Sequence, residues 1–347
     1  MASPSSAGSC MAATARMTLR PVVAQRTFGK TGLQVGILGF GAAPIGFEYV
    51  SDRTIDQLLG IAADSGINVI DTAAMYGDSE EKLGRALQVR SRRNQFLIFT
   101  KCGRHLPPRR DATGFLVRSQ RKLRRAFGVA DRYESLDWHP RVLKANIEQS
   151  LRRLKTDHID VIQLHTCSEA TLRQGDVIDA LQRARESGKA RHIGYSGDNG
   201  AAIFAIQCGQ FDSVQVSVNV VDQQALGVVL PLAAERGVGV IAKRPIAESL
   251  WMRPTRPAHA KYLHCQVYRD RLQKLRYEFL LGNRALEVAL RFTLRAQMHT
   301  AIVGTRNPAH LLQNVEYAVA GPLPPCEFEE IRTRWKDVAK PTWIGQT

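Results

Sequence analysis

The stretch Phe96-Leu97-Ile98-Phe99-Thr100-Lys101 runs through four consecutive apolar residues and then ends in two polar ones. A strand that is buried on both faces has such a continuous apolar run, whereas a half-exposed strand alternates apolar and polar residues. Short runs of this kind recur along the chain, at residues 38–42, 68–72, 96–101, 160–165, 192–196, 213–219, 239–244 and 300–304. We therefore expect eight strands, most of them buried on both faces.

Longer amphipathic segments lie between these runs. In residues 54–65, apolar side chains recur at spacings of three and four, and Gly66 follows as a typical signal of a helix C-terminus. Similar signals predict helices at 54–65, 79–88 (with Ser79 as the N-cap), 140–154, 181–186, 229–235 and 325–340. Eight alternations of strand and helix indicate an α/β fold with a closed parallel sheet, the (β/α)8 or TIM barrel.

Two connections are too long for simple turns. They follow the third and seventh strands and cover residues 102–139 and 245–283. Both leave the carboxyl ends of strands, which is the face on which barrel enzymes build their active sites. Loops of this length are usually functional lids or disordered segments, and the basic amphipathic residues 115–127 are a candidate lid helix.

The chain of 347 residues has a net charge of +16, and its hydrophobic fraction of 44% suffices for a globular core. No apolar run reaches the roughly 18 residues of a membrane-spanning helix, so we expect no membrane partner.

Residues 90–155 hold 18 Lys and Arg against 5 Asp and Glu, a net charge of +13. We favour a solvated, Arg-rich insertion over electrostatic steering of an anionic cofactor or substrate. Nucleic acid ranks last, because no nucleic-acid-binding module is recognisable.

Residues 1–20 are rich in Ser and Ala, contain no acidic residue and resemble a weak transit peptide, while Met11 and Met17 are alternative starts. We expect residues 1–24 to be a disordered extension and residues 25–347 to form the barrel of a cytoplasmic protein. An N-terminal targeting segment is the alternative.

The six cysteines form no C-x-x-C pair and no Cys/His cluster with zinc spacing, so neither a disulfide framework nor a metal site is expected.

Polar side chains stand at the ends of three consecutive strands. Asp71 closes the second strand, Lys101 the third and His165 the fourth. Tyr76 follows five residues after Asp71. Each residue taken singly is more often a helix cap, a surface group or a structural group than a catalytic one. Because the carboxyl ends of parallel strands meet at one mouth, the four together would form a buried polar cluster, which is costly without a function.

These residue types suit the reduction of a carbonyl group, which needs a hydride at carbon and a proton at oxygen. A free tyrosine has a pKa of about 10, and a nearby lysine cation lowers it, so that Tyr76 can act as the general acid. Asp71 would keep Lys101 charged and oriented. His165 would hydrogen-bond the carbonyl oxygen and fix its position.

An ordered set of motifs resembles the aldo-keto reductase family over nearly the whole chain, from Thr27 to the final helix. The motifs are Phe-Gly-Lys-Thr-Gly-Leu-Gln-Val at 28–35, the segment from Asp71 to Glu80, Gly-Lys-Ala-Arg-His-Ile-Gly-Tyr-Ser at 188–196, Gly-Thr-Arg-Asn-Pro at 304–308 and Gln-Asn-Val at 313–315. The resemblance implies a barrel with an N-terminal β-hairpin across its floor and a C-terminal helix. It also implies an NAD(P)H-dependent oxidoreductase with the catalytic residues Asp71, Tyr76, Lys101 and His165.

The resemblance implies a nicotinamide cofactor, with NADP(H) favoured and NAD(H) as the alternative. Ser196 and Gln215 match positions that bind the nicotinamide carboxamide. Gly197 stands where much of the family has Asn, and Asp198 or Asn199 is a candidate replacement.

Further cofactor contacts are implied near the seventh and eighth strands. Lys243 stands where the family often stacks an aromatic ring on the nicotinamide, and Lys243 and Arg244 either reach the pyrophosphate or are surface charges. The loop and helix after the eighth strand resemble the family's adenosine-phosphate segment, because helix N-termini favour anions. His310 holds the family's cationic position for the 2′-phosphate, with Arg306 as an alternative cation. The candidate contacts in this segment are Gly304, Arg306, His310, Gln313 and Asn314.

The leading hypothesis is therefore an oxidoreductase that reduces a small aldehyde, ketone or sugar with NADPH. One alternative is an NAD(P)-dependent sugar or alcohol dehydrogenase, suggested by Thr-Lys-Cys-Gly-Arg at 100–104. Another is an NADP(H)-binding redox-sensing subunit with low turnover. A basic nucleic-acid-binding protein is supported by charge alone. The sequence leaves the oligomeric state and the physiological substrate open.

Overall fold

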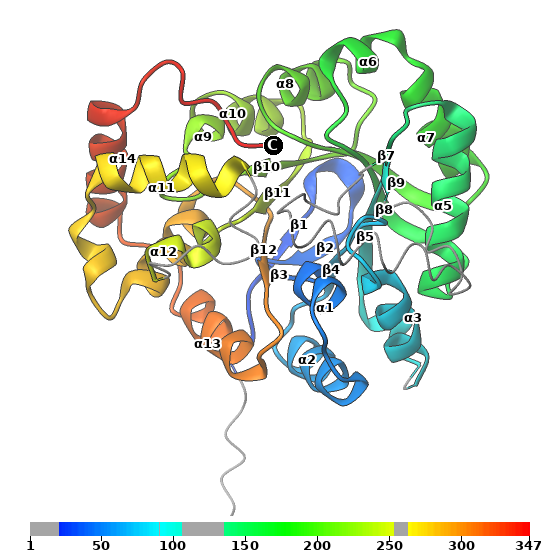
Figure 1. Cartoon of the computed structure of the whole chain (residues 1–347), viewed down its shortest axis with the longest axis horizontal. Coiled ribbons are helices and arrows are strands. Elements are labelled where there is room, and N and C mark those ends of the chain that lie inside the picture. Colours follow the sequence, from blue (N-terminus) through cyan, green and yellow to red (C-terminus); the bar gives the residue numbers. More distant parts are fainter. Residues whose placement is uncertain (1–20, 90, 106–134, 253–262) are drawn as a thin grey trace, which may run out of the picture.

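Eight parallel strands close into a barrel in the computed structural model, which describes residues 21–89, 91–105, 135–252 and 263–347. The barrel strands are β3 (Leu38–Gly41), β4 (Val69–Asp71), β5 (Leu97–Cys102), β8 (Ile159–His165), β9 (Ala190–Ser196), β10 (Ser213–Ser217), β11 (Gly239–Lys243) and β12 (Thr300–Gly304). The bounds of each strand lie within two residues of those expected, so the predicted (β/α)8 barrel is confirmed. Neighbours in the barrel follow chain order, and β12 pairs with β3 to close it (Figure 1).

Glycines at the seam between β12 and β3 let the first and last barrel strands approach each other. A Cβ atom on Gly39 would lie 2.6 Å from Cδ1 of Ile302, and one on Gly41 would lie 2.9 Å from Cγ2 of the same residue. Both distances are too short for carbon atoms in a packed interior. A larger side chain at either position would therefore displace the side chain of Ile302 from the seam.

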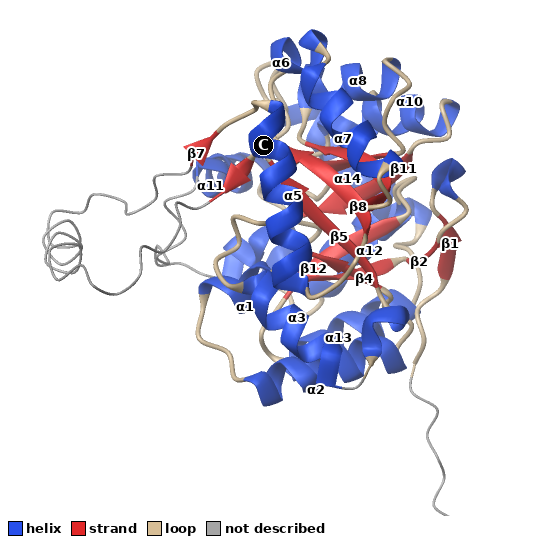
Figure 2. Cartoon of the chain, turned by 90° about the vertical axis from the view of Figure 1, so that its right-hand side faces the viewer, coloured by secondary structure: helices blue, strands red, loops and turns tan. Residues whose placement is uncertain are grey.

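Helices surround the barrel on its outside (Figures 1 and 2). The main ones are α2 (Asp52–Asp64), α3 (Ser79–Val89), α5 (Pro140–Leu154), α7 (Asp176–Glu186), α8 (Asn199–Gln207), α10 (Val229–Glu235), α12 (Ala285–Arg295) and α13 (Pro308–Val319). Shorter ones are α1 (Ala43–Phe47), α6 (Glu169–Gln174), α9 (Gln224–Gly227), η1 (Gly29–Thr31), η2 (Arg92–Gln95) and η5 (Glu278–Leu281). Helix α2 begins before the expected residue 54, because Ser51 is its N-cap and accepts a hydrogen bond from Thr54 N at 3.1 Å.

Ser79 is the first residue of α3 and does not act as the cap predicted from the sequence. Its hydroxyl donates to the carbonyl oxygen of Ala42 at 3.0 Å and lies 2.9 Å from Oγ1 of Thr72. Ala42 follows β3 and Thr72 follows β4. The side chain therefore ties the start of α3 to the carboxyl ends of two strands, next to the turn that carries Tyr76.

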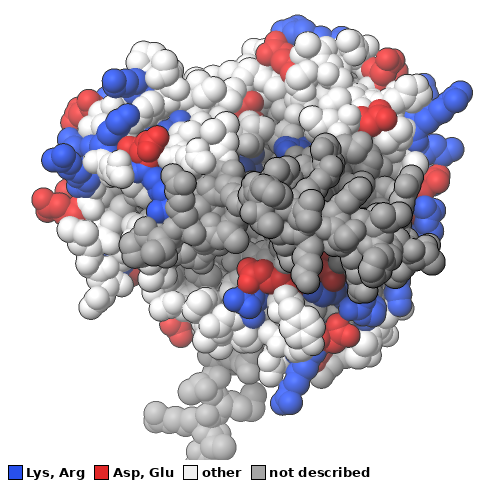
Figure 3. All heavy atoms as spheres, viewed as in Figure 1, with Lys and Arg blue, Asp and Glu red and all other residues white. Residues whose placement is uncertain are grey.

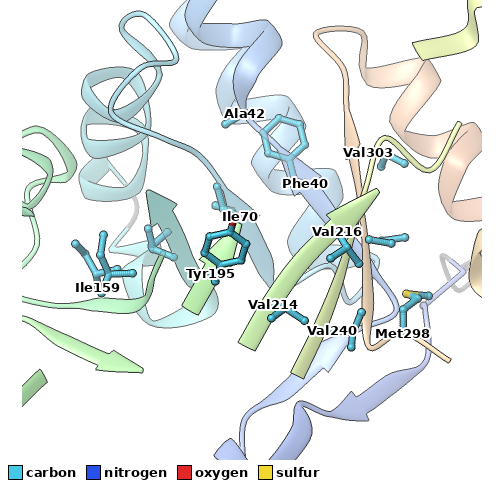
Figure 4. Packing of buried hydrophobic residues seen from close by; sticks show 14 of the residues in the cluster. Phe40, Ala42, Ile70, Ile159, Tyr195, Val214, Val216, Val240, Met298 and Val303 are labelled. Carbon is cyan, nitrogen blue, oxygen red and sulfur yellow. The ribbon is translucent and has the colours of Figure 1, made fainter. Parts of the chain in front are cut away.

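The main apolar core fills the layer between the strands and the helices. Phe40, Ile70, Val214, Val216 and Val240 belong to it and are at most 1% exposed (Figure 4). Burying a side chain of this size stabilises a fold by about 1.5–3 kcal/mol relative to leaving it exposed. The strands read as continuous apolar runs because one face meets this layer and the other faces the barrel interior.

An antiparallel hairpin closes the amino-terminal end of the barrel. Strand β1 (Gln25–Thr27) pairs with β2 (Gln34–Gly36), which confirms the hairpin that the resemblance implied. Phe28 lies between the two strands, is fully buried and packs its ring 5.5 Å from that of Phe99 on β5. The hairpin thus inserts an aromatic side chain into the barrel interior and leaves the opposite, carboxyl-terminal mouth for chemistry.

Two expectations concern residues outside the described part of the chain. The disordered extension and its targeting alternative fall mainly on residues 1–20, and the lid helix falls on residues 115–127, so both stay predictions. Val23 is 2% exposed, and its N–H donates to Ser65 O at 2.9 Å. The division of the chain at residue 24 also stays a prediction, but Val23 favours an earlier start of the packed domain.

The two long connections carry some secondary structure of their own. After β5, β6 (Arg104–His105) pairs with β7 (Ser135–Leu136). After β11 come η3 (Ala247–Met252) and α11 (Leu263–Leu275), which packs near the closing helix α14 (Pro325–Val338). This helix confirms the expected C-terminal helix, and the chain beyond it returns toward the barrel mouth (Figure 1).

Within the described residues, no helix has the length and apolar character needed to cross a membrane. On the face shown in Figure 3, basic and acidic side chains are interspersed around the visible rim. Much of the basic stretch at residues 90–155 falls on 106–134, outside the described residues. Its interpretation as a solvated insertion stays a prediction.

Candidate active site

Asp71 and Lys101 form a buried ion pair at the mouth of the barrel. Nζ of Lys101 lies 2.7 Å from Oδ1 and 2.8 Å from Oδ2 of Asp71, and it also donates to Thr72 O at 2.9 Å. The two residues are 4% and 1% exposed. Buried charges persist only when they are paired and hydrogen-bonded, so Asp71 keeps Lys101 charged, and the contacts hold both side chains in place.

Tyr76 lies beside this pair, in the turn between β4 and α3. The ammonium of Lys101 lies 5.1 Å from the centre of the Tyr76 ring. The ring of His165 lies 5.9 Å from that of Tyr76, at an interplanar angle of 85°. The turn approaches α1 closely, because a Cβ atom on Gly46 would lie 1.8 Å from Tyr76 O. The four residues that the sequence predicted as catalytic therefore meet at one mouth.

The phenol of Tyr76 does not have the low pKa expected from the sequence. Burial raises its pKa above the ordinary value, and the positive charge of Lys101 offsets this only in part. Burial is the largest single effect on the pKa of Lys101 and lowers it, but the negative charges of Asp71 and of the Tyr76 phenolate, together with hydrogen bonds to both groups, outweigh burial, so the pKa of Lys101 is raised. The lysine acts in the expected direction, and desolvation of the phenol is the larger effect. The phenol of Tyr76 is consequently neutral at physiological pH.

His165 ends β8 and is 7% exposed. Burial lowers its pKa well below the ordinary value, and the neighbouring cations Lys101, Arg104, Lys243 and Arg244 lower it further. The imidazole is therefore neutral at physiological pH. Its Nδ1 atom is buried and has no hydrogen-bond partner within the described part of the chain. A neutral imidazole donates one hydrogen bond and accepts another, which suits a polar ligand atom at the mouth.

Ser196 ends β9 and Gln215 lies on β10, and Gln215 links both of them to the ion pair. Oγ of Ser196 donates to Oε1 of Gln215 at 2.9 Å, and Nε2 of Gln215 donates to Oδ2 of Asp71 at 3.0 Å. A hydrogen-bonded chain thus runs from β9 through β10 to β4 and on to Lys101. The sequence predicted Ser196 and Gln215 only as cofactor contacts and missed the link to Asp71.

Lys243 ends β11 and is held by the carboxylate of Asp198. Its Nζ lies 2.8 Å from Oδ2 of Asp198, and the two side chains are 13% and 2% exposed. Asp198 also accepts from Ser217 N at 2.7 Å. Lys243 is therefore a largely buried group at the mouth, and the interpretation as a surface charge is wrong. Asp198 is engaged with Lys243 and Ser217, away from the role proposed for it as a replacement for the amide missing at Gly197.

Arg244 follows Lys243 with a left-handed backbone, at φ 56°. Its Nη1 donates to Oγ of Ser217 at 2.9 Å and to the carbonyl oxygen of Gln346 at 2.5 Å. Its positive charge lowers the pKa of both Tyr76 and His165, so the guanidinium lies close to the predicted catalytic residues. The sequence contained no signal that the C-terminal end of the chain would reach this arginine.

The residues predicted for the adenosine end lie at the end of β12, on the β12–α13 loop and in the first turns of α13. Gly304, His310 and Gln313 are exposed, whereas Asn314 is 8% exposed. Asn307 caps α13 by accepting from Ala309 N at 3.0 Å. The positive end of the helix dipole and the cation Arg306 beside it fit a phosphate.

Arg306 is the most prominent cation of this loop. Its Nε lies 2.9 Å from Oε2 of Glu48, and the side chains are 58% and 46% exposed. An exposed pair of this kind contributes little to stability, so Glu48 does not prevent Arg306 from turning to a bound anion.

Arg104 is a further cation near His165. It donates through Nη1 to Oγ1 of Thr166 at 2.7 Å, and Thr166 directly follows His165 with a left-handed φ of 64°. The sequence showed Arg104 only as part of a motif. Its position near His165 depends on the direction that β6 takes after β5, and no local sequence pattern predicts that direction.

Comparison with known proteins agrees with this geometry. The sequence model described as "Aldo/keto reductase family" matches residues 37–336. An L-galactose dehydrogenase of Arabidopsis thaliana is 28% identical over 291 residues, covering 76% of this chain and 82% of the relative. A D-threo-aldose 1-dehydrogenase of a Pseudomonas species is 30% identical over 304 residues, covering 83% of this chain and 90% of the relative.

The fold is shared with solved structures. A crystal structure of an aldo-keto reductase from Klebsiella pneumoniae in complex with NADPH superposes with a TM-score of 0.64. It is 20% identical, and the match covers 93% of this chain and 96% of that protein. At this identity the likeness establishes the barrel architecture.

Proposed function

The chain belongs to the aldo/keto reductase family, and from this premise we propose that it transfers a hydride between NADP(H) and a small aldehyde, ketone or sugar. The observation that carries this proposal is the convergence of Asp71, Tyr76, Lys101 and His165 at one mouth of the barrel. Carbonyl reduction needs a group that donates a proton to the carbonyl oxygen and groups that position and support this donor. The phenol, the ion pair and the neutral imidazole meet these needs.

In the proposed reduction, Tyr76 donates the proton to the carbonyl oxygen. NADPH, when bound, supplies the hydride. The raised pKa of the phenol keeps it protonated before the reaction, and Lys101 stabilises the phenolate that remains afterwards. Asp71 keeps Lys101 in position through two short contacts. His165, which is neutral, positions the carbonyl oxygen by donating a hydrogen bond without competing for the proton.

Residues from the second half of the barrel would hold the cofactor. Ser196 and Gln215 present a hydroxyl and an amide beside Asp71, which fits a nicotinamide carboxamide at the site of hydride transfer. Lys243 and Arg244 supply positive charge for the pyrophosphate. The proposed contacts at the adenosine end are Gly304, Arg306, His310, Gln313 and Asn314. Arg306 and His310 favour NADP(H), because a 2′-phosphate adds a dianion that the ribose of NAD(H) lacks.

A second candidate function runs the reaction in the opposite direction, as a sugar dehydrogenase. Two relatives that cover most of this chain are named an L-galactose dehydrogenase and a D-threo-aldose 1-dehydrogenase. The same four residues serve both directions, because a phenolate on Tyr76 accepts the proton that a neutral phenol donates. We therefore include aldoses among the proposed substrates.

The test is a screen of the purified chain in both directions. NADPH and NADH are each offered with a panel of aldehydes and ketones, and NADP⁺ and NAD⁺ with a panel of aldoses, while cofactor absorbance is followed. We expect turnover with NADPH or NADP⁺. Tight cofactor binding without turnover across both panels would support a low-activity redox-sensing subunit in its place. The absence of both binding and turnover would contradict the proposal.

A further inference from the structure

The last residues of the chain return to the barrel mouth. We call residues 343–346, with the sequence Trp-Ile-Gly-Gln, the C-terminal tail. Trp343 anchors its start: the side chain is 9% exposed, and its ring lies 5.2 Å from that of Trp335 on α14. The guanidinium of Arg271 lies 5.3 Å from the centre of the same ring. From this anchor the tail runs to the carboxyl ends of β9, β10 and β11 (Figure 1).

Side chains from several elements hold the backbone of the tail. Asn199, at the start of α8, accepts from Gly345 N at 2.8 Å and donates to Gly345 O at 2.9 Å. Asp222 accepts from Gln346 N at 2.9 Å. Arg271 donates to Ile344 O at 2.6 Å. The tail is thus recognised through its main chain, residue by residue.

Gly345 is required for this fit. A Cβ atom at this position would lie 2.8 Å from Cβ and 3.2 Å from Cγ of Asp198. Asp198 cannot move aside easily, because it is 5% exposed and bound to both Ser217 and Lys243. The groove therefore accepts glycine and excludes even alanine at the point of closest approach.

The end of the tail takes hydrogen bonds from a residue that we propose for the cofactor. The carbonyl oxygen of Gln346 accepts from Oγ of Ser217 at 2.8 Å and from Nη1 of Arg244 at 2.5 Å. One donor ends β10 and the other directly follows β11, and both converge on this single oxygen. An oxygen of the cofactor's pyrophosphate would seek the same cation.

We propose that the C-terminal tail competes with the cofactor for Arg244, so that NADP(H) binds only when Gln346 leaves the mouth. The proposal rests on the proposed function, because it takes Arg244 as a phosphate ligand. A charged phosphate oxygen is a stronger acceptor for a guanidinium than a neutral carbonyl is, which favours exchange of the tail for the cofactor. The tail contacts must break before the cofactor binds, so only molecules whose tail has left the mouth are competent to bind. The apparent affinity for the cofactor is therefore the intrinsic affinity multiplied by the fraction of molecules in that state.

The test compares NADPH binding by the full-length chain and by two variants that unseat the tail. One variant ends at Ile344, which removes residues 345–347 and keeps Trp343. The other is Gly345→Ala, which keeps the length and introduces the clash with Asp198. Thr342→Ala, at an exposed position before the tail, is the matched control. Binding is measured by fluorescence titration and stopped flow, after circular dichroism has shown that each variant is folded.

We expect both tail variants to bind NADPH faster and roughly tenfold tighter than the full-length chain, with Thr342→Ala unchanged. Hydrogen exchange should also show that the amides of Gly345 and Gln346 lose protection when NADPH saturates the full-length chain. Unchanged affinity and rates in both variants, or increased protection on binding, would overturn the competition. So would weaker binding by both variants, which would make the tail part of the cofactor seat. If neither the full-length chain nor the variants bind NADPH, the proposed function itself fails, and the competition fails with it.

Discussion

The side-chain amide of Gln215 donates a hydrogen bond to Oδ2 of Asp71 at 3.0 Å, although the two residues stand on β10 and β4, on different sides of the barrel. Asp71 in turn holds Lys101, and Gln215 is itself held by Ser196. Two of the proposed cofactor contacts and the ion pair beside the proposed proton donor therefore belong to one hydrogen-bonded chain. A cofactor amide that binds Ser196 and Gln215 would reach the ion pair through a single side chain.

Replacement of Gln215 by Leu should affect both catalysis and cofactor binding. The variant removes one donor from a buried carboxylate, which costs about 1–3 kcal/mol when the group is left without compensation. We expect kcat to fall roughly tenfold and the KM for NADPH to rise. Ser196→Ala is the comparison, because it does not touch Asp71 and should raise the KM with little change in kcat. Equal effects of the two variants on kcat would contradict a role of Gln215 in holding Asp71.

The barrel and the four residues at its mouth were predictable because their signals are local. A strand buried on both faces has a continuous apolar run in its sequence. The polar residues Asp71, Lys101 and His165 stand at the ends of such runs. Parallel strands in a closed barrel then bring these ends together without any further information. Residues 140–154 and 229–235 were predictable for the same reason, since proline and glycine mark helix ends.

The rest depends on distances between segments far apart in the chain. Asp198 forms an ion pair with Lys243, and Asn199 donates a hydrogen bond to Gly345 O. No spacing of residues in the sequence predicts either contact. The pKa of Tyr76 was expected to be lowered by Lys101, and burial reverses the sign. Desolvation is set by how closely the whole mouth packs around the phenol, which a list of neighbouring residue types does not contain.

Replacement of Tyr76 by Phe should abolish turnover and preserve cofactor binding. The ring is retained, so its packing beside His165 survives, and only the proton donor is lost. General acid catalysis typically contributes a factor of about 100 to 10,000, and we expect kcat to fall by at least the lower figure. Tyr49→Phe is the matched control for the loss of a hydroxyl, because Tyr49 is 91% exposed. Turnover by Tyr76→Phe at the rate of the control would remove Tyr76 from the mechanism.

The two directions of the reaction should respond differently to pH. The pKa of Tyr76 is raised by burial, so below about pH 10 the phenol stays neutral. Reduction uses this neutral form, and its kcat with saturating NADPH should be nearly constant between about pH 6 and 9. Oxidation uses the phenolate, whose fraction rises tenfold per pH unit below the pKa, so its kcat should rise by about that factor. A reduction rate that falls about tenfold between pH 7 and 9 would indicate a donor with a lower pKa.

Replacement of Arg306 by Ala should weaken NADPH binding more than NADH binding. The guanidinium is 58% exposed and forms an ion pair with the carboxylate of Glu48 on the facing loop. A hydrogen bond between charged groups contributes about 1.5–3 kcal/mol to binding. Because Arg306 is exposed to solvent, we expect its contribution to lie at the lower end of this range. We expect the Kd for NADPH to rise roughly tenfold, with the Kd for NADH nearly unchanged. Both constants are measured by fluorescence titration at one ionic strength, because exposed charges are screened by salt.

Glu48→Gln provides the opposite change at the same ion pair. Without the carboxylate, Arg306 loses the anion that competes with a 2′-phosphate, and local repulsion of the phosphate also disappears. The Kd for NADPH should therefore fall, by roughly two- to threefold given the small energies of exposed pairs, while the Kd for NADH stays the same. Equal shifts for the two cofactors in both variants would mean that Arg306 contacts a part common to NADPH and NADH. The preference for NADP(H) would then have to come from His310.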